Sequence, residues 1–262
     1  MKISIVQFAP VLGDINGNIS LLSENFRDAW ESDLVVLPEL ASSGYRFNGR
    51  DEALASAEQV DDSRYIDFLE SMAGTYDCHI VSGFNEKDGD KLYNSSVLVG
   101  PQGLLGIYRK LHLFRDEKNI FAPGNLGAEV FDTPLGKIGM LVCFDWMFPE
   151  VWRKMALAGA QLVCHPSNLV LPYCQTAVQA HSLLNRMFVA TANRIGKERD
   201  LAFTGQSVLY SPKGEVLGKG SIDKSELITV EIDLKDADDK WITSENHIFY
   251  DRRVDVYNDL SD

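Results

Sequence analysis

Apolar and polar residues alternate along the first third of the chain in a pattern that predicts a βαβ unit followed by another helix and strand. Residues 2–9 and 33–40 are apolar runs rich in β-branched side chains, which indicates buried strands. Residues 16–32, between them, carry apolar side chains near helical spacing and predict an amphipathic helix: Ile19, Leu22, Phe26 and Trp30. A helix over 62–74 and a strand over 78–84 repeat the alternation, which favours parallel pairing.

Later in the chain the pattern changes to three segments in which a Pro-x-Gly turn separates two strand-like runs, at 97–108, 130–141 and 208–218. Proline pre-sets φ for a turn and glycine tolerates positive φ, so each segment predicts a β-hairpin. Two helices, over 149–159 and 173–187, and a strand over 161–167 are predicted between the second and third hairpins. No low-complexity linker divides the chain, so we expect one α/β domain over 1–262, with a mixed sheet core covered by helices.

The bulk composition narrows the functional classes. A net charge of −13 disfavours binding to nucleic acid or to an anionic membrane surface. The spacing of the four cysteines matches neither a disulfide framework nor a Cys-x-x-Cys motif, which is typical of reduced thiols in a cytoplasmic protein. The N-terminus lacks the long apolar region of a signal peptide, and no apolar run approaches the roughly 20 residues that span a bilayer.

Three apolar runs end on polar groups whose chemistries complement one another: Glu39, Lys110 and Cys143. Alone, each residue has an ordinary interpretation as a turn cap, a surface base or a core thiol. In open α/β sheets, however, functional groups collect beyond the carboxyl ends of strands, so the three can share one site. A cation such as Lys110, and a helix that Pro149 would begin just after Cys143, are both expected to lower the pKa of the thiol. Glu39 would accept the thiol proton.

These residues lie in segments that resemble the three signature segments of the nitrilase superfamily, the carbon–nitrogen hydrolases: LVVLPEL, YRKLHLF and GMLVCFDWMFPE. The resemblance also covers ISIVQFAP, LYNSSVLVGPQG, GAQLVCHPSN and YDRR, and therefore nearly the whole chain. It implies an αββα sandwich in which Glu39, Lys110 and Cys143 are catalytic. It further implies that Glu117, seven residues after the lysine, orients that lysine and positions the substrate. Members of the family usually form dimers, and the helices flanking QLVCHPSN would lie at that interface.

The mechanism that the resemblance implies begins with attack of the Cys143 thiolate on an amide or nitrile carbon. Lys110 and the backbone N–H of Phe144 would stabilise the developing negative charge, as an oxyanion hole does. Water activated by Glu39 would then hydrolyse the thioester to the acid. Such a reaction requires neither a metal ion nor an organic cofactor. The five histidines form no His-x-x-x-His pair and no Cys/His cluster, so no zinc site is predicted.

The substrate is predicted to be a small neutral aliphatic amide or nitrile, in a compact and largely apolar pocket. Tyr45, Phe114 and Trp146 suggest such a pocket, and Phe144 and Asn168 complete the predicted substrate-binding set. No arginine follows Cys143 before Arg153, although a guanidinium is well suited to bind a carboxylate through two hydrogen bonds. This weakens assignment as an ω-amidase or N-carbamoyl amino acid amidase, and CFDWMFPE matches the carbamoylputrescine branch only partly.

Three alternatives remain open at this stage. A Cys–His dyad would use His112 or His165, which also lie close to strand ends. An acyltransferase would resolve the thioester with an amine in place of water. A scaffold protein would keep the fold without catalysis, although all three catalytic residue types are present.

Overall fold

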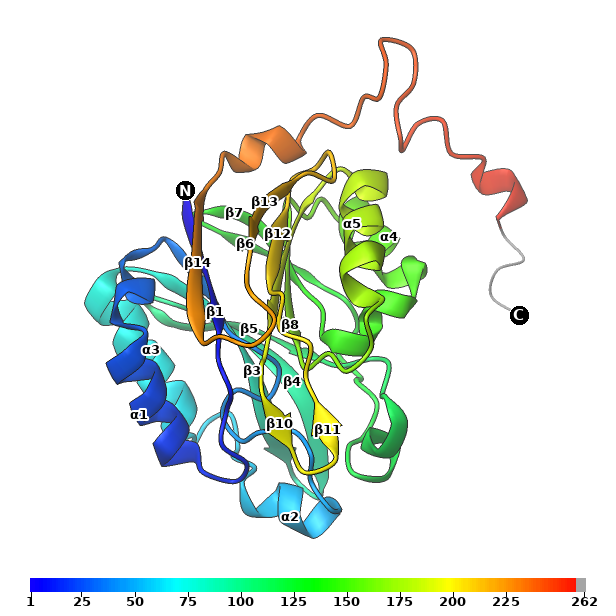
Figure 1. The fold of residues 1–262 in the computed structure, drawn as a ribbon. Coiled ribbons are helices and arrows are strands. Elements are labelled where there is room, and N and C mark those ends of the chain that lie inside the picture. The colour runs from blue at the N-terminus through cyan, green and yellow to red at the C-terminus, as the bar shows by residue number, and fades with distance from the viewer. Residues whose placement is uncertain (258–262) are drawn as a thin grey trace.

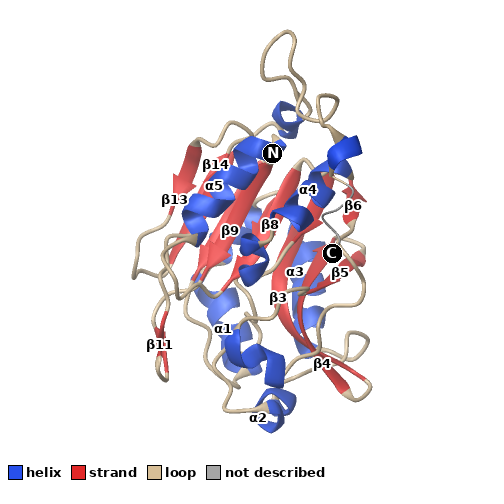
Figure 2. Ribbon diagram, turned by 90° about the vertical axis from the view of Figure 1, so that its right-hand side faces the viewer, coloured by secondary structure: helices blue, strands red, loops and turns tan. Residues whose placement is uncertain are grey.

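A computed structural model describes residues 1–257 and contains two six-stranded mixed sheets that pack face to face (Figures 1 and 2). The first sheet has the strand order β14-β1-β2-β3-β4-β5, in which β1, β2 and β3 are parallel and the other neighbours are antiparallel. Its strands are β1 (Lys2–Gln7), β2 (Leu34–Val36), β3 (His79–Asp88), β4 (Lys91–Gly100), β5 (Gly103–Arg109) and β14 (Glu226–Glu231).

The second sheet has the order β13-β12-β9-β8-β7-β6, and its parallel centre is formed by β7, β8 and β9. The remaining pairs in this sheet are antiparallel. Its strands are β6 (Val130–Thr133), β7 (Gly136–Met140), β8 (Leu162–Ser167), β9 (Phe188–Asn193), β12 (Val208–Tyr210) and β13 (Val216–Lys219).

Helices cover the outer face of each sheet and complete an αββα sandwich. The first sheet is covered by α1 (Ile15–Asn25) and α3 (Arg64–Tyr76), and the second by α4 (Pro149–Leu157) and α5 (Cys174–Asn185) (Figures 1 and 2). The connections contain the remaining elements: the 3₁₀ helices η1 (Arg27–Glu31), η2 (Arg115–Asn119), η3 (Cys143–Met147), η4 (Leu234–Ala237) and η5 (Val254–Val256), helix α2 (Arg50–Ala55), and the short hairpin β10 (Lys197–Glu198) and β11 (Leu201–Ala202).

The alternation of side chains along each strand explains why the sheets have two buried faces. In β2, Leu34 and Val36 point into the core between the sheets, whereas Val35 packs in the core beneath the helices. The strand period of two thus places apolar residues on both faces, as expected for a sheet covered on both sides. The inter-sheet core contains side chains from both sheets, for example Ile5 and Met140, whose sulfur contacts the hydroxyl of Ser96 in β4.

The predicted αββα class and the three predicted hairpins are confirmed. The hairpins are the antiparallel pairs β4–β5, β6–β7 and β12–β13. One prediction was too simple: residues 16–32 form not a single helix but α1 followed by η1. The α-helix stops at Phe26, whose backbone N–H bonds to the carbonyl of Leu22, and the chain then tightens into the 3₁₀ turn.

The structure also contains elements that no local pattern predicted: α2, β9, β14 and the β10–β11 hairpin. Strand β14 pairs with β1 over the full length of both strands, although more than 200 residues separate them in the chain. The single domain over 1–262 stays a prediction, and residues 258–262 lie outside the described part of the chain. Within residues 1–257, no helix is long and apolar enough to cross a membrane.

Gly83 in β3 is a point at which the fold directly controls the position of Glu39. Its backbone N–H donates to the carbonyl of Pro38 at 3.1 Å. A Cβ added at Gly83 would lie 2.5 Å from the Cα of Glu39 and would also collide with the backbone nitrogen of Leu40. Only glycine lets these two backbone segments approach so closely.

We therefore expect Gly83→Ala to lower the free energy of unfolding by about 1–3 kcal/mol, since backbone atoms must move to accommodate the methyl group. Urea denaturation measures this change. Gly74→Ala, inside α3, is the matched control: its Cβ meets only the carbonyl oxygen of Pro101 at 3.7 Å, so the variant should be stabilised by up to about 1 kcal/mol. Equal stability of the two variants would contradict the steric argument.

Candidate active site

The four residues predicted to be catalytic lie together where three strands end. Glu39 follows β2 and Lys110 follows β5, both in the first sheet, whereas Cys143 follows β7 in the second sheet. Glu117 comes from η2, in the connection after β5. All four side chains are buried. The site is therefore assembled from both halves of the sandwich.

Lys110 connects the two carboxylates. Its Nζ lies 2.7 Å from Oε1 of Glu39 and 2.8 Å from Oε1 of Glu117. Burial opposes a charge on Lys110, but the two carboxylates outweigh this effect and raise the pKa of the ammonium above its ordinary value. Lys110 is thus a permanent cation between two acids.

The two oxygens of Glu39 have different surroundings. Oε1 accepts hydrogen bonds from Lys110 and from Nδ2 of Asn94, the latter at 2.7 Å. Oε2 is buried and has no hydrogen-bond partner among residues 1–257. A buried carboxylate oxygen without a donor is costly unless another group supplies a proton. Oε2 is therefore the oxygen available to a thiol, a substrate N–H or a water molecule.

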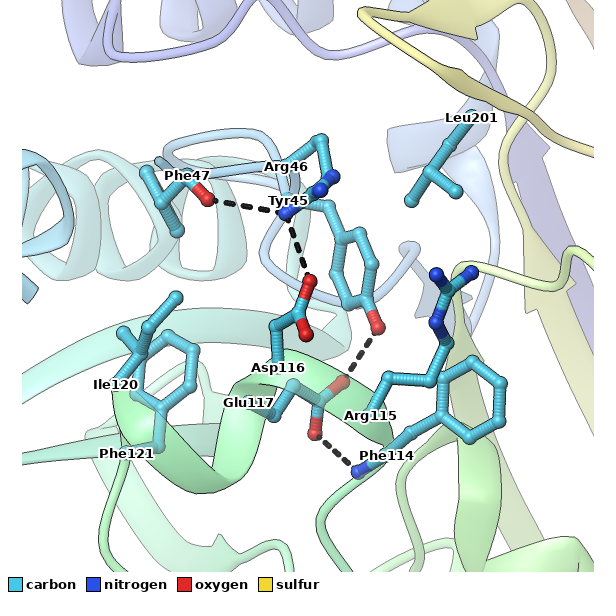
Figure 3. A pocket seen from close by; sticks show the side chains of 10 residues that line it. All are labelled: Tyr45, Arg46, Phe47, Phe114, Arg115, Asp116, Glu117, Ile120, Phe121 and Leu201. Carbon is cyan, nitrogen blue, oxygen red and sulfur yellow. Dashed lines mark hydrogen bonds and ion pairs between the residues drawn. The ribbon is translucent and has the colours of Figure 1, made fainter. Parts of the chain in front are cut away.

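Glu117 is held by three donors. Besides Lys110, the hydroxyl of Tyr45 donates to its Oε1 at 2.7 Å, and the backbone N–H of Phe114 donates to its Oε2 at 3.1 Å (Figure 3). Burial is the main cause that raises the pKa of Glu117 above its ordinary value, and the hydrogen bonds from Lys110 and Tyr45 oppose that rise. Tyr45, predicted to bind substrate, thus has a clear contact with Glu117.

Cys143 occupies a strained turn at the start of η3, with a φ of 43°. A positive φ in a residue other than glycine is uncommon and points to a functional constraint. His165 holds this turn by donating from Nε2 to the carbonyl of Cys143 at 2.8 Å. The carboxylate of Asp145 holds it from the other side, because Oδ2 accepts from the backbone N–H of Val142 at 2.9 Å and from the hydroxyl of Tyr108 at 2.7 Å.

The predicted lowering of the Cys143 pKa is wrong. Burial raises the pKa of this thiol well above its ordinary value, the charge of Glu39 raises it further, and the opposing effects of Lys110 and a backbone hydrogen bond from Asn168 are smaller. Pro149 does open α4 as predicted, but Cys143 lies in the separate turn η3 and not at the start of that helix. The resting cysteine is therefore a neutral thiol that needs a base.

The structure gives no support to a Cys–His dyad. His165 contacts the backbone carbonyl of Cys143 and not its sulfur, and burial lowers the pKa of His165 to about 4. His112 bonds through Nδ1 to Asp145 at 2.7 Å and stacks on Phe148. Both histidines support the turn that carries the cysteine.

Two adjoining pockets contain all the residues predicted to bind substrate. The pocket at the thiol has apolar walls and a volume of only about 10 Å³, which admits about one water molecule. It is lined by Phe114, Cys143, Phe144, Trp146, Asn168, Leu169, Val170 and Leu171. The second pocket, at Glu117, shares Phe114 with the first and includes Tyr45, Arg46, Arg115 and Asp116 in its wall (Figure 3).

Sequence reasoning missed Asn94 and Asp145 as parts of this site. Asn94 contacts Glu39 across the sheet, and Asp145 fixes the turn at Cys143. The only signal was position: Asp145 stands two residues after the cysteine within the signature segment, and Asn94 within LYNSSVLVGPQG. The catalytic roles of Glu39, Lys110, Glu117 and Cys143 themselves stay predictions.

Comparison with known proteins places this arrangement in a family. Residues 2–240 match the carbon–nitrogen hydrolase family. The chain is 43% identical to a nitrilase from Pyrococcus abyssi, over 98% of this chain and 99% of that protein. It is 35% identical to an (R)-stereoselective amidase from Pseudomonas sp., over 89% and 85% of the two chains.

The crystal structure of an amidase from Nesterenkonia sp. superposes with a TM-score of 0.85 at 26% identity, and the match covers 98% of this chain and 95% of that one. Sequence and structure thus agree over almost the entire chain. The resemblance found in the three signature segments is confirmed: this chain belongs to the carbon–nitrogen hydrolase family and is an enzyme of the nitrilase and amidase type.

Proposed function

We propose that the protein hydrolyses a small neutral aliphatic amide or nitrile to a carboxylic acid and ammonia through a thioester on Cys143. One observation carries this proposal: a buried Lys110 pairs with both Glu39 and Glu117 beside a buried thiol. The open oxygen of Glu39 supports its role as the base.

In the first step Oε2 of Glu39 takes the proton of Cys143 as the sulfur attacks the amide carbon. The raised pKa of the thiol makes this general-base step necessary, because little thiolate exists beforehand. Lys110 and the backbone N–H of Phe144 stabilise the negative charge that develops on the carbonyl oxygen. The C–N bond then breaks, Glu39 returns the proton to the leaving nitrogen, and ammonia departs.

In the second step water attacks the thioester carbon. Glu39 again accepts a proton, the C–S bond breaks, the proton returns to sulfur, and the acid leaves. A nitrile would first form a thioimidate, which takes up one water molecule and loses ammonia to reach the same thioester. Glu117 stays ionised throughout and keeps the ammonium of Lys110 in position.

The wall of the pocket at the thiol supports a neutral substrate. Its side chains are apolar apart from Cys143 and Asn168, and no arginine among residues 1–257 lines it. Arg46 in the neighbouring pocket already pairs with Asp116 and Asp200, and Arg115 lies in the wall of that pocket and not of the one at the thiol. A charged substrate group at the thiol would therefore lose its hydration without a partner, which is costly.

The proposal predicts ammonia release from propionamide or propionitrile, with lower kcat/KM for glutaramate and N-carbamoylputrescine. Cys143→Ala should lower kcat at least about 10³-fold, because it removes the nucleophile. Cys78→Ala is the matched control: Cys78 is buried in the core beneath the helices of the first sheet, away from the inter-sheet core, and should affect stability but not chemistry. Colorimetric ammonia detection and intact-mass analysis of the acyl adduct provide the measurements.

Each of these measurements has a result that would contradict the proposed function. Preference for glutaramate would indicate an ω-amidase, and preference for N-carbamoylputrescine a carbamoyl amidase. A new amide formed with an added amine would indicate an acyltransferase. Full activity of Cys143→Ala would refute the thioester mechanism, and no turnover of any compound would favour a scaffold.

The pH dependence of kcat/KM should report Glu117. Activity requires the ionised carboxylate, so activity falls as the pH drops through the raised pKa of Glu117. Tyr45→Phe removes a hydrogen bond that stabilises the ionised form, which raises this pKa further. The acid limb should therefore move to higher pH, by about 0.5–1 unit.

Tyr65→Phe is the control for this shift. The hydroxyl of Tyr65 is also buried and bonds to Ser82 at 2.8 Å, outside the site. The acid limb of the pH profile of Tyr65→Phe should coincide with that of the wild type. A Tyr45→Phe profile that shifts to lower pH, or does not shift, would remove Glu117 as the titrating group.

The expected homodimer and cytoplasmic location are also proposals. All four cysteines are free, which supports a reducing compartment. Helices α4 and α5, which flank β8, form the outer face turned toward the viewer in Figure 2. Leu183 and Leu184 on α5 are 44% and 56% exposed, which supports a partner on this face.

Leu184→Glu should therefore convert a dimer to a monomer, because it places a charge in the apolar contact. Sedimentation velocity measures the change. Ile222→Glu, at a residue that is also exposed but lies between β13 and β14, should leave the dimer intact. A monomeric wild type, or a dimer unaffected by Leu184→Glu, would exclude α5 as the interface.

A further inference from the structure

The β10–β11 hairpin holds the segment that carries Tyr45. Oε2 of Glu198 accepts the backbone N–H groups of both Tyr45, at 2.9 Å, and Arg46, at 2.5 Å. Glu198 lies about 150 positions further along the chain, so this contact fixes a loop of the first sheet to an element that follows β9. One carboxylate oxygen thus sets the backbone position of two successive residues.

Glu198 is itself held rigidly. Its Oε1 pairs with Arg194 at 2.8 Å, and the side chains of Arg194 and Glu198 are only 1% and 7% exposed. Arg194 also donates to the carbonyl of Pro10 at 3.2 Å. A buried ion pair of this kind contributes little net stability compared with an apolar pair of similar shape, so its value lies in fixing geometry.

The same arginine also positions the aromatic ring of Tyr45. The guanidinium carbon of Arg194 lies 4.1 Å from the ring centroid of Phe203, within range of a cation–π interaction. Phe203 in turn packs edge-on against the ring of Tyr45, with 6.0 Å between centroids. Backbone and side chain of Tyr45 therefore depend on the Arg194–Glu198 pair.

The hydroxyl of Tyr45 connects this segment to the site by a hydrogen bond. It donates to Oε1 of Glu117 (Figure 3). The same oxygen accepts from Lys110. If Tyr45 moves, that oxygen loses one of its two donors and the position of the lysine is less well defined. A chain of direct contacts runs from Glu198 through Tyr45 and Glu117 to Lys110.

We infer that Glu198 is a positioning residue for the reaction, and that it acts on Lys110 through Tyr45 and Glu117. This inference rests on the proposed function of the site. The alternative is that the Arg194–Glu198 ion pair has a purely structural role. In that case loss of the pair would reduce the amount of folded protein, and its effect would not depend on the Tyr45 hydroxyl.

A double-mutant cycle separates these two roles. Glu198→Ala should lower kcat/KM about 10-fold in the wild-type background, because the Tyr45 segment loses its acceptor. In the Tyr45→Phe background, where the hydroxyl is already absent, the same change should cost less than about 2-fold. Two losses that multiply in the double variant would overturn the inference, as would an unchanged kcat/KM in Glu198→Ala.

The rate at which iodoacetamide alkylates Cys143 gives the same test without a substrate. The thiol loses its proton as the C–S bond forms and iodide leaves, so the rate depends on Glu39 and Lys110. Intact-mass analysis should show about 5-fold slower alkylation in Glu198→Ala, and no further slowing when Tyr45→Phe is added. Absence of amide turnover would refute the proposed function, whereas independent effects on alkylation would refute the positioning role alone.

Glu58→Ala is the matched control. Glu58 also accepts a backbone N–H, from Tyr65 at 3.2 Å, and pairs with an arginine, Arg64, at 2.8 Å. It should lower thermal stability without changing kcat/KM or the alkylation rate. If Glu198→Ala is not recovered folded, Glu198→Gln replaces it in both backgrounds. That variant should lose about 3-fold in the wild-type background alone, and a wild-type rate or an equal loss in both backgrounds would overturn the inference.

Discussion

The pairing of one buried ammonium with two buried carboxylates is the interaction on which the rest of the site depends. Taking three charges out of water is expensive, and the attraction between them repays this cost only if the geometry is fixed. Lys110 satisfies that condition with two short contacts, and Asn94 and Tyr45 supply further donors. Lys110, Glu39 and Glu117 together carry one net negative charge, so a further negative charge beside them, such as a thiolate, is unfavourable.

This electrostatic constraint explains why the cysteine rests as a neutral thiol. Many reactive cysteines are activated in advance by a lowered pKa. Here burial raises the pKa of the Cys143 thiol, and the nearby carboxylates raise it further. A protonated thiol is a weak nucleophile, so the proposed reaction needs a base beside Cys143.

Sequence reasoning identified the elements that carry local signals. The strand endings at Glu39, Lys110 and Cys143 were visible because each follows an apolar run, and the hairpins because of their Pro-x-Gly turns. The contacts of Tyr45 with Glu117, of Asn94 with Glu39 and of β14 with β1 join residues 55 to more than 200 positions apart. No local pattern encodes such pairs. The rise in the pKa of Cys143 could not be predicted from the sequence either, because it depends on how completely the folded chain excludes water.

The division of the site between two sheets has a consequence for how the enzyme tolerates change. Glu39 and Lys110 are attached to one sheet and Cys143 to the other, so the distance between the Glu39 carboxylate and the Cys143 sulfur depends on how the two sheets pack against each other. Side chains such as Ile5 and Met140 lie between the two sheets. A methyl group gained or lost there would shift sulfur relative to carboxylate by a fraction of an ångström. Residues of the inter-sheet core therefore help to set the geometry of a site that they do not line.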